Sequence, residues 1–184
     1  MIDRKHACRL ADAVTIDGMV PSDVQLTLAS SEVPTVVGAQ DAWNGPGDAC
    51  VKFDVSRDGE HVYLVARVTD DVVMEGDGLT VYVDGRPMSD RSQYRRLGRG
   101  AYSVEVAAPQ DGASNVTARA YGRGPEPKGV RGAATATSDG YDVELALPAA
   151  LFGESLDSFQ LCLAISDRDE ESDEDCTILW RGSN

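Results

Sequence analysis

Residues 42–87 read AWNGPGDACVKFDVSRDGEHVYLVARVTDDVVMEGDGLTVYVDGRP. In this stretch apolar and polar side chains alternate three times, at Val51/Phe53/Val55, at Val62/Leu64/Ala66/Val68 and at Leu79/Val81/Val83. Such alternation, bounded by Asp and Gly, is typical of half-buried antiparallel strands, because successive side chains of a strand point to opposite faces. The short segment Ser56–Glu60 contains Asp-Gly and predicts a hairpin between the first two strands.

Further strands of the same kind are predicted on both sides of this stretch, at residues 13–18, 25–29, 34–38, 102–107, 116–121, 130–137, 141–148, 159–165 and 177–180. Pro148 ends one of them, and residues 149–153 are long enough for one helical turn closed by Gly153. Many short strands with hardly any helix predict an all-β protein, a two-sheet antiparallel β-sandwich of immunoglobulin-like or jelly-roll-like type. At 184 residues, we expect a single domain over residues 1–184.

The charge and hydropathy of the chain exclude two classes of partner. The formal net charge is −14, from 31 acidic and 17 basic residues, and it disfavours nucleic acid, because phosphate binding needs a basic face. No apolar run reaches the length of about 18 residues that a membrane span requires. The first ten residues lack the apolar core of a signal peptide.

The four cysteines, Cys8, Cys50, Cys162 and Cys176, form no Cys-x-x-Cys pair, and the chain has two histidines. This pattern argues against a zinc site. The sequence does not rank the three disulfide pairings that four cysteines allow, and half-buried thiols are an equal alternative.

Acidic residues gather in the loops at the ends of the predicted strands. Loop carboxylates that are distant in sequence can converge in space, and Ca²⁺ takes about six to eight oxygen ligands. The candidate ligands are Asp48, Asp70, Asp77, Asp167 and Asp169. We therefore expect a structural calcium ion, with a merely solubilising acidic surface as the alternative.

The order of three motifs resembles a known family. A Trp-x-Gly-x-x-Asp segment that begins at Trp43 precedes VYLVARVTDD at residues 62–71 and GDGLTVYVD at residues 76–84. This series is similar to that of the family 9 carbohydrate-binding modules and their DOMON-type relatives. The resemblance implies a non-catalytic module without an organic cofactor that binds a poly- or oligosaccharide by aromatic stacking. It also implies an accessory domain of a larger secreted protein, in the extracellular space or periplasm.

The family's sugar slot, as the resemblance implies it, lies between two tryptophans with a glutamate and an arginine nearby. Trp180 matches the later tryptophan, Met74 stands in place of the earlier one, and Thr80 replaces the glutamate. Ser103, after Tyr102, stands where the arginine would be. Residues that could compensate for these changes are Trp43, Tyr63, Tyr82, Tyr94 and the arginine-rich loop at residues 88–100. For Trp43, a structural ring at the end of the sandwich is the favoured interpretation.

These replacements make a second function nearly as well supported: a structural or protein-contact module whose sugar site has degenerated. A glycoside hydrolase is less well supported, although Glu105 and Glu144 lie mid-strand as the paired carboxylates of such enzymes do. A haem-binding DOMON domain could draw axial ligands from Met74, Met88 and His61, but three phenylalanines are few for a wide apolar pocket. We expect the protein not to be an enzyme.

Overall fold

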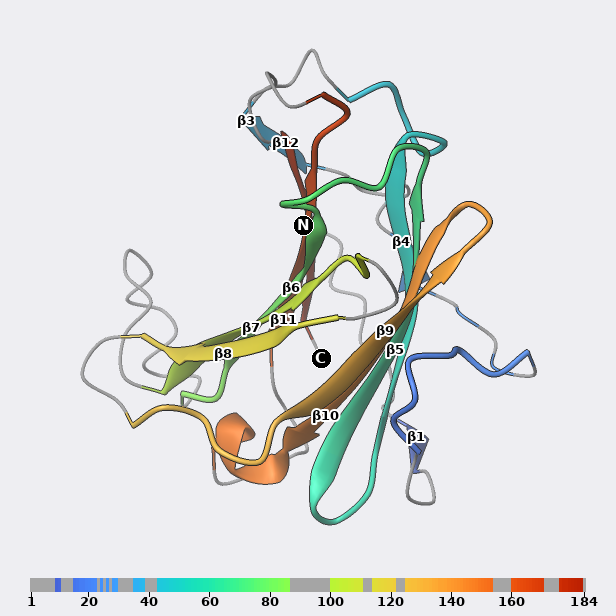
Figure 1. The fold of residues 1–184 in the computed structure, drawn as a ribbon. Helices are drawn as coiled ribbons and strands as arrows, with labels where there is room; N and C mark the ends of the chain where they lie inside the picture. Colours follow the sequence, from blue (N-terminus) through green and yellow to red (C-terminus); the bar gives the residue numbers. More distant parts are fainter. Residues whose placement is uncertain are drawn as a thin grey trace.

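The computed structural model describes residues 9–10, 15–22, 24, 26, 28–29, 35–38, 43–86, 100–110, 114–121, 125–153, 160–170 and 176–183. These residues form two six-stranded sheets packed face to face, as Figure 1 shows. The predicted β-sandwich is confirmed, and the helical element within the described residues is the short turn η2 (Ala149–Phe152). Among the described residues, no helix has both the length and the apolar composition to cross a bilayer.

The first sheet, sheet A, contains β1 (Arg9–Leu10), β2 (Leu28–Ala29), β4 (Ala49–Arg57), β5 (His61–Asp70), β9 (Arg131–Thr137) and β10 (Gly140–Pro148). Its order is β1-β4-β5-β10-β9, with β2 also paired to β4. All pairs are antiparallel except β1 with β4. The long central strands β5 and β10 pair along their whole length.

The second sheet, sheet B, contains β3 (Thr35–Gly38), β6 (Gly78–Asp84), β7 (Ala101–Ala107), β8 (Val116–Ala120), β11 (Gln160–Asp167) and β12 (Cys176–Ser183). Its order is β3-β12-β11-β6-β7-β8, and every pair is antiparallel. The chain therefore passes between the sheets several times, for example from β5 in sheet A to β6 in sheet B.

The hydrophobic core lies between the two sheets and consists of the alternate apolar positions that the sequence predicted. Its fully buried side chains include Phe53, Leu64, Leu79, Leu145 and Leu163. Lys52 of β4 and Arg67 of β5, on the opposite face of sheet A, are exposed. This division follows from the two-residue period of a strand.

Two local predictions are confirmed and one is wrong. The hairpin closes with the Asp58 N–H donating to the His61 carbonyl at 3.0 Å, and η2 follows Pro148 and ends at Gly153. The strand predicted at residues 13–18 is absent from the part that the structure describes, residues 15–18, which bends at Asp17 and Gly18. The backbone N–H groups of these two residues donate to a side-chain carboxylate instead of a neighbouring strand.

Candidate functional site

Acidic side chains from both sheets meet at one end of the sandwich. Asp48 precedes β4 and Asp70 ends β5 in sheet A, whereas Asp77 precedes β6 and Asp167 ends β11 in sheet B. Asp70 lies opposite Ala49 in the β4–β5 pair, so Asp48 and Asp70 are neighbours. The strand ends thus bring together loop residues that are up to 119 positions apart, as the sequence predicted. We call this group, with Asp71 and Asp169, the acidic cluster.

Three members of the acidic cluster are close enough to share one ion. Carboxylate oxygens of Asp48, Asp71 and Asp169 all lie within 4.8 Å of one another. Asp71 was not among the predicted ligands, although its position directly after Asp70 could have suggested it. Asp70 and Asp71 are adjacent at the end of a strand, so their side chains point in different directions. Only the coordinates show that Asp71 is the one that faces Asp169.

The three other members carry oxygens that lack a hydrogen-bond partner. Within the described residues, Asp70 Oδ2, Asp77 Oδ1 and Asp167 Oδ1 are buried without one. The exposed fractions of these residues are 2%, 3% and 3%. Burial of an unpaired carboxylate oxygen is unfavourable by a few kcal/mol. These oxygens therefore fit a cationic ligand, in addition to Arg168, whose positive charge lowers the pKa of Asp77.

The electrostatics of the acidic cluster follow from the same burial. Burial raises the pKa of Asp70 to about 7, and the nearby charges of Asp77 and Asp71 add to the effect. Burial, followed by the charge of Asp70, raises the pKa of Asp167 to about 7. Burial likewise raises the pKa of Asp77 to about 6. A bound cation would remove this penalty by pairing with the ionised carboxylates.

The donor set indicates which cation would fit. The cluster offers carboxylate oxygens, which are hard ligands and suit Ca²⁺ better than softer metals. Tyr141 lies nearby, fully buried, with its hydroxyl lacking a partner in the described structure. Burial raises the pKa of Tyr141 well above its usual value, with the charges of Asp70, Asp77 and Asp167 adding to it. Its hydroxyl therefore stays protonated beside the carboxylates.

The residues predicted to contact sugar do not form one group. Thr80 and Ser103 lie on the outer face of sheet B, between core residues of β6 and β7. Tyr102 faces the other way and packs against the core. Met74 is half-buried in the turn before β6, and its N–H donates to Asp77 Oδ2.

The two tryptophans belong to different parts of the sandwich. Trp43 packs against the core, and its indole N–H donates to the Ala49 carbonyl at 3.0 Å, which is the structural role considered above. Trp180 lies in β12 opposite Leu163, and its side chain is outside the described residues. Its neighbour Leu179 lies opposite Ala164 of β11, and Ala164 lies opposite Thr80 of β6. Leu179 and Thr80 therefore belong to the same row of paired residues across sheet B.

The outer face of sheet B also carries a pair of aromatic rings. The ring centroids of Tyr82 and Tyr121 are 6.5 Å apart, and the ring planes are inclined by 34°. Both side chains are partly exposed. Tyr82 was named in advance as a compensating ring, but Tyr121 was not. The alternation Thr117, Arg119, Tyr121 along β8 and beyond is the signal that could have placed Tyr121 on this face.

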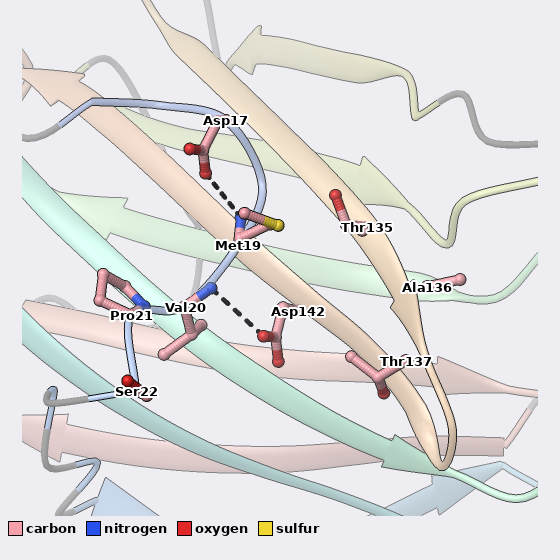
Figure 2. A pocket seen from close by; sticks show the side chains of 9 residues that line it. All are labelled: Asp17, Met19, Val20, Pro21, Ser22, Thr135, Ala136, Thr137 and Asp142. Atoms are coloured by element: carbon pink, nitrogen blue, oxygen red, sulfur yellow. Dashed lines mark hydrogen bonds between the residues drawn. The ribbon is translucent and has the colours of Figure 1, made fainter.

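A cavity of about 430 Å³ lies on the other side of the sandwich, over the outer face of sheet A. One wall is the segment from Asp17 to Ser22, which we call the N-terminal strap, and the other includes Thr135 and Thr137 of β9. Figure 2 shows the strap crossing in front of the strands, with Met19 next to Thr135.

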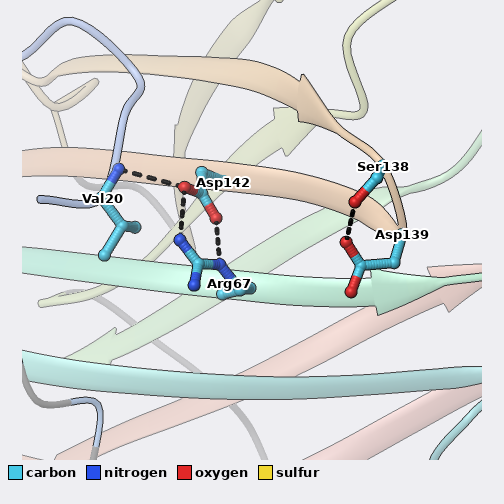
Figure 3. A network of polar contacts seen from close by, with 5 residues as sticks. All are labelled: Val20, Arg67, Ser138, Asp139 and Asp142. Carbon is cyan, nitrogen blue, oxygen red and sulfur yellow. Dashed lines mark hydrogen bonds and ion pairs between the residues drawn. The ribbon is translucent and has the colours of Figure 1, made fainter. Parts of the chain in front are cut away.

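Two carboxylates of β10 hold the N-terminal strap. Glu144 Oε2 accepts the N–H groups of Asp17 and Gly18, both at 2.9 Å. Asp142 accepts the N–H of Val20 at 3.2 Å and forms a bidentate ion pair with Arg67, at 2.7 and 2.9 Å, as Figure 3 shows. Glu144 therefore binds backbone, and it lies in sheet A, whereas Glu105 lies in sheet B.

The solved structures that this chain resembles include two carbohydrate-binding modules. One is a family 9 carbohydrate-binding module from Caldicellulosiruptor kristjanssonii in complex with cellotriose, with a TM-score of 0.65 and 15% identity over 94% of this chain and 81% of that chain. The other is a family 9 module from the same organism in complex with glucose, with a TM-score of 0.62 and 16% identity over 95% of this chain and 85% of that chain. No protein-family model and no curated protein matches the sequence. The resemblance that the motifs indicated is thus found again in three dimensions, and the chain has the fold of a family 9 carbohydrate-binding module.

Proposed function

We propose that this protein is a non-catalytic carbohydrate-binding module that recognises a poly- or oligosaccharide by stacking a sugar ring on an aromatic side chain. The observation that carries the proposal is the likeness over nearly the whole chain to two modules solved with cellotriose and glucose. The module would serve as an accessory domain of a secreted, extracellular or periplasmic polysaccharide-active protein.

The positions of the mid-strand glutamates support a non-catalytic role. Retaining and inverting glycosidases need two carboxyl groups that flank one bond, about 5 to 9.5 Å apart. Glu144 is 1% exposed and holds the N-terminal strap, whereas Glu105 is exposed on the opposite sheet. These two residues therefore do not act on one substrate.

Trp180 is the residue that the family resemblance nominates for stacking. Calorimetric titration with cellotriose tests it in each variant, and in the unaltered protein tryptophan fluorescence should change as well, because a sugar that stacks on an indole changes its emission. We expect Trp180→Ala to weaken binding about tenfold or more. The matched control is Trp43→Phe, which removes the bond to Ala49 and leaves sugar binding unchanged. Unaltered binding by Trp180→Ala would show that the sugar is held elsewhere.

The same titration separates the second candidate function. A protein-contact module with a degenerate sugar site would bind none of a panel of neutral gluco-, xylo- and manno-oligosaccharides at millimolar concentration. This alternative is supported by the replacements at Met74, Thr80 and Ser103, which leave a thioether and two hydroxyls where the family pattern has an indole, a carboxylate and a guanidinium.

The proposal includes a structural Ca²⁺ ion in the acidic cluster, held by Asp48, Asp70, Asp77, Asp167 and Asp169, with Asp71 as a further ligand. The unpartnered buried oxygens support it. A ligand that binds only the folded state at 100 times its Kd stabilises that state by about 2.7 kcal/mol. We therefore expect Ca²⁺ to raise Tm and a chelator to lower it.

The variants that test the calcium site are Asp70→Asn and Asp167→Asn. Each removes a negative charge while keeping the shape of the side chain, so the Tm increase on adding Ca²⁺ should shrink or disappear. Asp139→Asn, an exposed residue of the β9–β10 turn, is the matched control and should keep the full increase. Equal Tm in Ca²⁺ and chelator for the unaltered protein would contradict the site.

A further inference from the structure

We propose that a further sugar unit of the ligand, besides the one that would stack on Trp180, is received by the tyrosine platform, the pair Tyr82 and Tyr121 on the outer face of sheet B. This inference rests on the proposed function, since it names the surface that would bind the carbohydrate. The ligand class is a neutral hexose unit of a polysaccharide, lying with its C–H face on the two rings.

The register of sheet B brings the two rings together. Tyr82 of β6 lies opposite Ser103 of β7, and Ser103 lies opposite Arg119 of β8. Tyr121 follows β8, and its N–H donates to the Ala101 carbonyl at 2.9 Å, which fixes its backbone to β7. The side-by-side order of β6, β7 and β8 is visible in Figure 1. Three strands therefore hold the platform, which is a rigid support for a binding surface.

The platform is not part of the packing that stabilises the sandwich. Neither Tyr82 nor Tyr121 belongs to the buried core or to the side chains packed against it, whereas Tyr102, on the inner face, does. The inclination of 34° between the rings means that they lie beside each other in a tilted arrangement instead of a parallel stack. Partly exposed aromatic rings that the core does not use are typical of binding surfaces.

The polar side chains around the platform match the hydroxyl groups of a sugar. Ser103 and Arg119 share the row of Tyr82, and Thr80 and Glu105 form the next row. Together they offer a guanidinium donor, a carboxylate acceptor and two hydroxyls that both donate and accept. A few polar groups beside an apolar surface are what a small-molecule site needs for orientation.

Charge favours a neutral ligand over an acidic one. The net charge of −14 repels polyanions over long range. Glu105, one of the polar side chains around the platform, adds a negative charge close to the ligand. Burial, followed by Tyr121, Cys162 and Glu105, raises the pKa of Tyr82, so its hydroxyl stays protonated at neutral pH and can donate to the sugar. A chain of uronic acids should therefore bind more weakly than a neutral glucan.

The test is a calorimetric titration of the whole chain with cellotriose and with trigalacturonate. We expect Tyr82→Ala and Tyr121→Ala each to weaken cellotriose binding at least about tenfold, and Tyr82→Phe to stay within about threefold, because it keeps the ring. Thr117→Ala, an exposed residue on the same face of β8, is the matched control. Thermal unfolding of each variant checks that it folds.

A measurement on the unaltered protein keeps the proposal testable if a tyrosine variant does not fold. In NMR titrations with cellotriose, the amide signals of Ser103 and Arg119 should shift, and those of Thr135 and Thr137 on sheet A should not. If the unaltered protein binds but the tyrosine variants bind equally well, the platform is overturned and the proposed function stands. If the unaltered protein binds no neutral sugar, both are overturned.

Discussion

Glu144 is the side chain whose role differs most from what its sequence position suggests. It lies in the middle of β10 and is 1% exposed, with its carboxylate on two backbone N–H groups of the N-terminal strap. Burial raises its pKa, and the two N–H donors act in the opposite direction. Charge-assisted bonds of this kind are stronger than neutral ones. The residue therefore stabilises the attachment of the strap.

We expect Glu144→Ala to lower the free energy of unfolding by about 2 to 3 kcal/mol, because it leaves two N–H groups without their acceptor. Urea unfolding measures this change. Glu105→Ala is the matched control, a mid-strand glutamate on an exposed face, and it should stay within about 0.5 kcal/mol of the unaltered protein. Equal effects of the two substitutions would contradict the role of Glu144 in holding the strap.

Gly140 begins β10 with a φ of 132°, and a Cβ there would come within 2.2 Å of the Val68 carbonyl oxygen. We expect Gly140→Ala to lower the free energy of unfolding by about 3 kcal/mol or more, from backbone strain and from this contact together. Gly45→Ala isolates the strain, because Gly45 has a φ of 110° but open space around it. A Tm for Gly140→Ala as high as that for Gly45→Ala would contradict the importance of the contact.

At the scale of secondary structure, β10 is the most completely buried strand among the described residues. It pairs with β5 on one side and β9 on the other, and residues 140–147 are buried on both faces. The core covers one face, and the N-terminal strap lies over part of the other. β8, by contrast, is an edge strand with alternate exposed residues.

Hydrogen exchange should reflect this difference. We expect the amides of β10 to exchange most slowly, near the rate set by global unfolding, and those of β8 to exchange several orders of magnitude faster through local opening. Mass spectrometry of exchanged peptides measures both. Comparable protection of the two strands would mean that sheet B does not open at its β8 edge before the whole molecule unfolds.

The strands could be predicted from the sequence wherever one face of a strand meets the core and the other meets water. This holds for β4 and β6, whose alternation sets their register. Prediction from alternation fails for residues 15–18. The N–H groups of Asp17 and Gly18 donate to a carboxylate more than 120 positions away, and no local sequence pattern encodes such a bond. Prediction from alternation also missed β1, a two-residue strand paired in parallel with β4.

Of the candidate sites, one could likewise be predicted from the sequence and the other could not. The acidic cluster could be predicted because aspartates at strand ends converge in any sandwich with this order of strands. The sugar-contacting residues could not be selected with the same certainty, since Tyr102 and Ser103 are adjacent in sequence but face opposite sides of sheet B. The partnership of Tyr82 with Tyr121 depends on the β6–β7–β8 register, which only the structure supplies.

Considered as a whole, the molecule should become less stable as pH rises when no cation is bound. The pKa values of Asp70 and Asp167 are about 7 and that of Asp77 is about 6, all above the ordinary value of 3.8. At pH values between 3.8 and these raised pKa values, the three carboxyl groups are still protonated in the folded state but already ionised in the unfolded state. Stability therefore falls as pH rises from about 4 to about 7.

Urea unfolding at pH 5, 6, 7 and 8 with a chelator present measures this slope. The double variant Asp70→Asn/Asp167→Asn should have a much smaller slope, because two of the three titrating groups are gone. Saturating Ca²⁺ should also reduce or reverse the slope in the unaltered protein, since the ion binds the ionised carboxylates. Stability that rises with pH in the chelator would contradict the burial of these groups.

The N-terminal strap has a practical consequence for anyone who shortens this chain. A trimming guided by the first long run of alternating residues would start near Trp43 and discard Asp17, Gly18 and Val20. Of the partners that the structure describes, Glu144 would then lose the Asp17 and Gly18 N–H groups, and Asp142 would lose Val20 and keep Arg67. The smallest version that folds as the intact protein does should therefore reach back at least to Asp17, well before the first long strand.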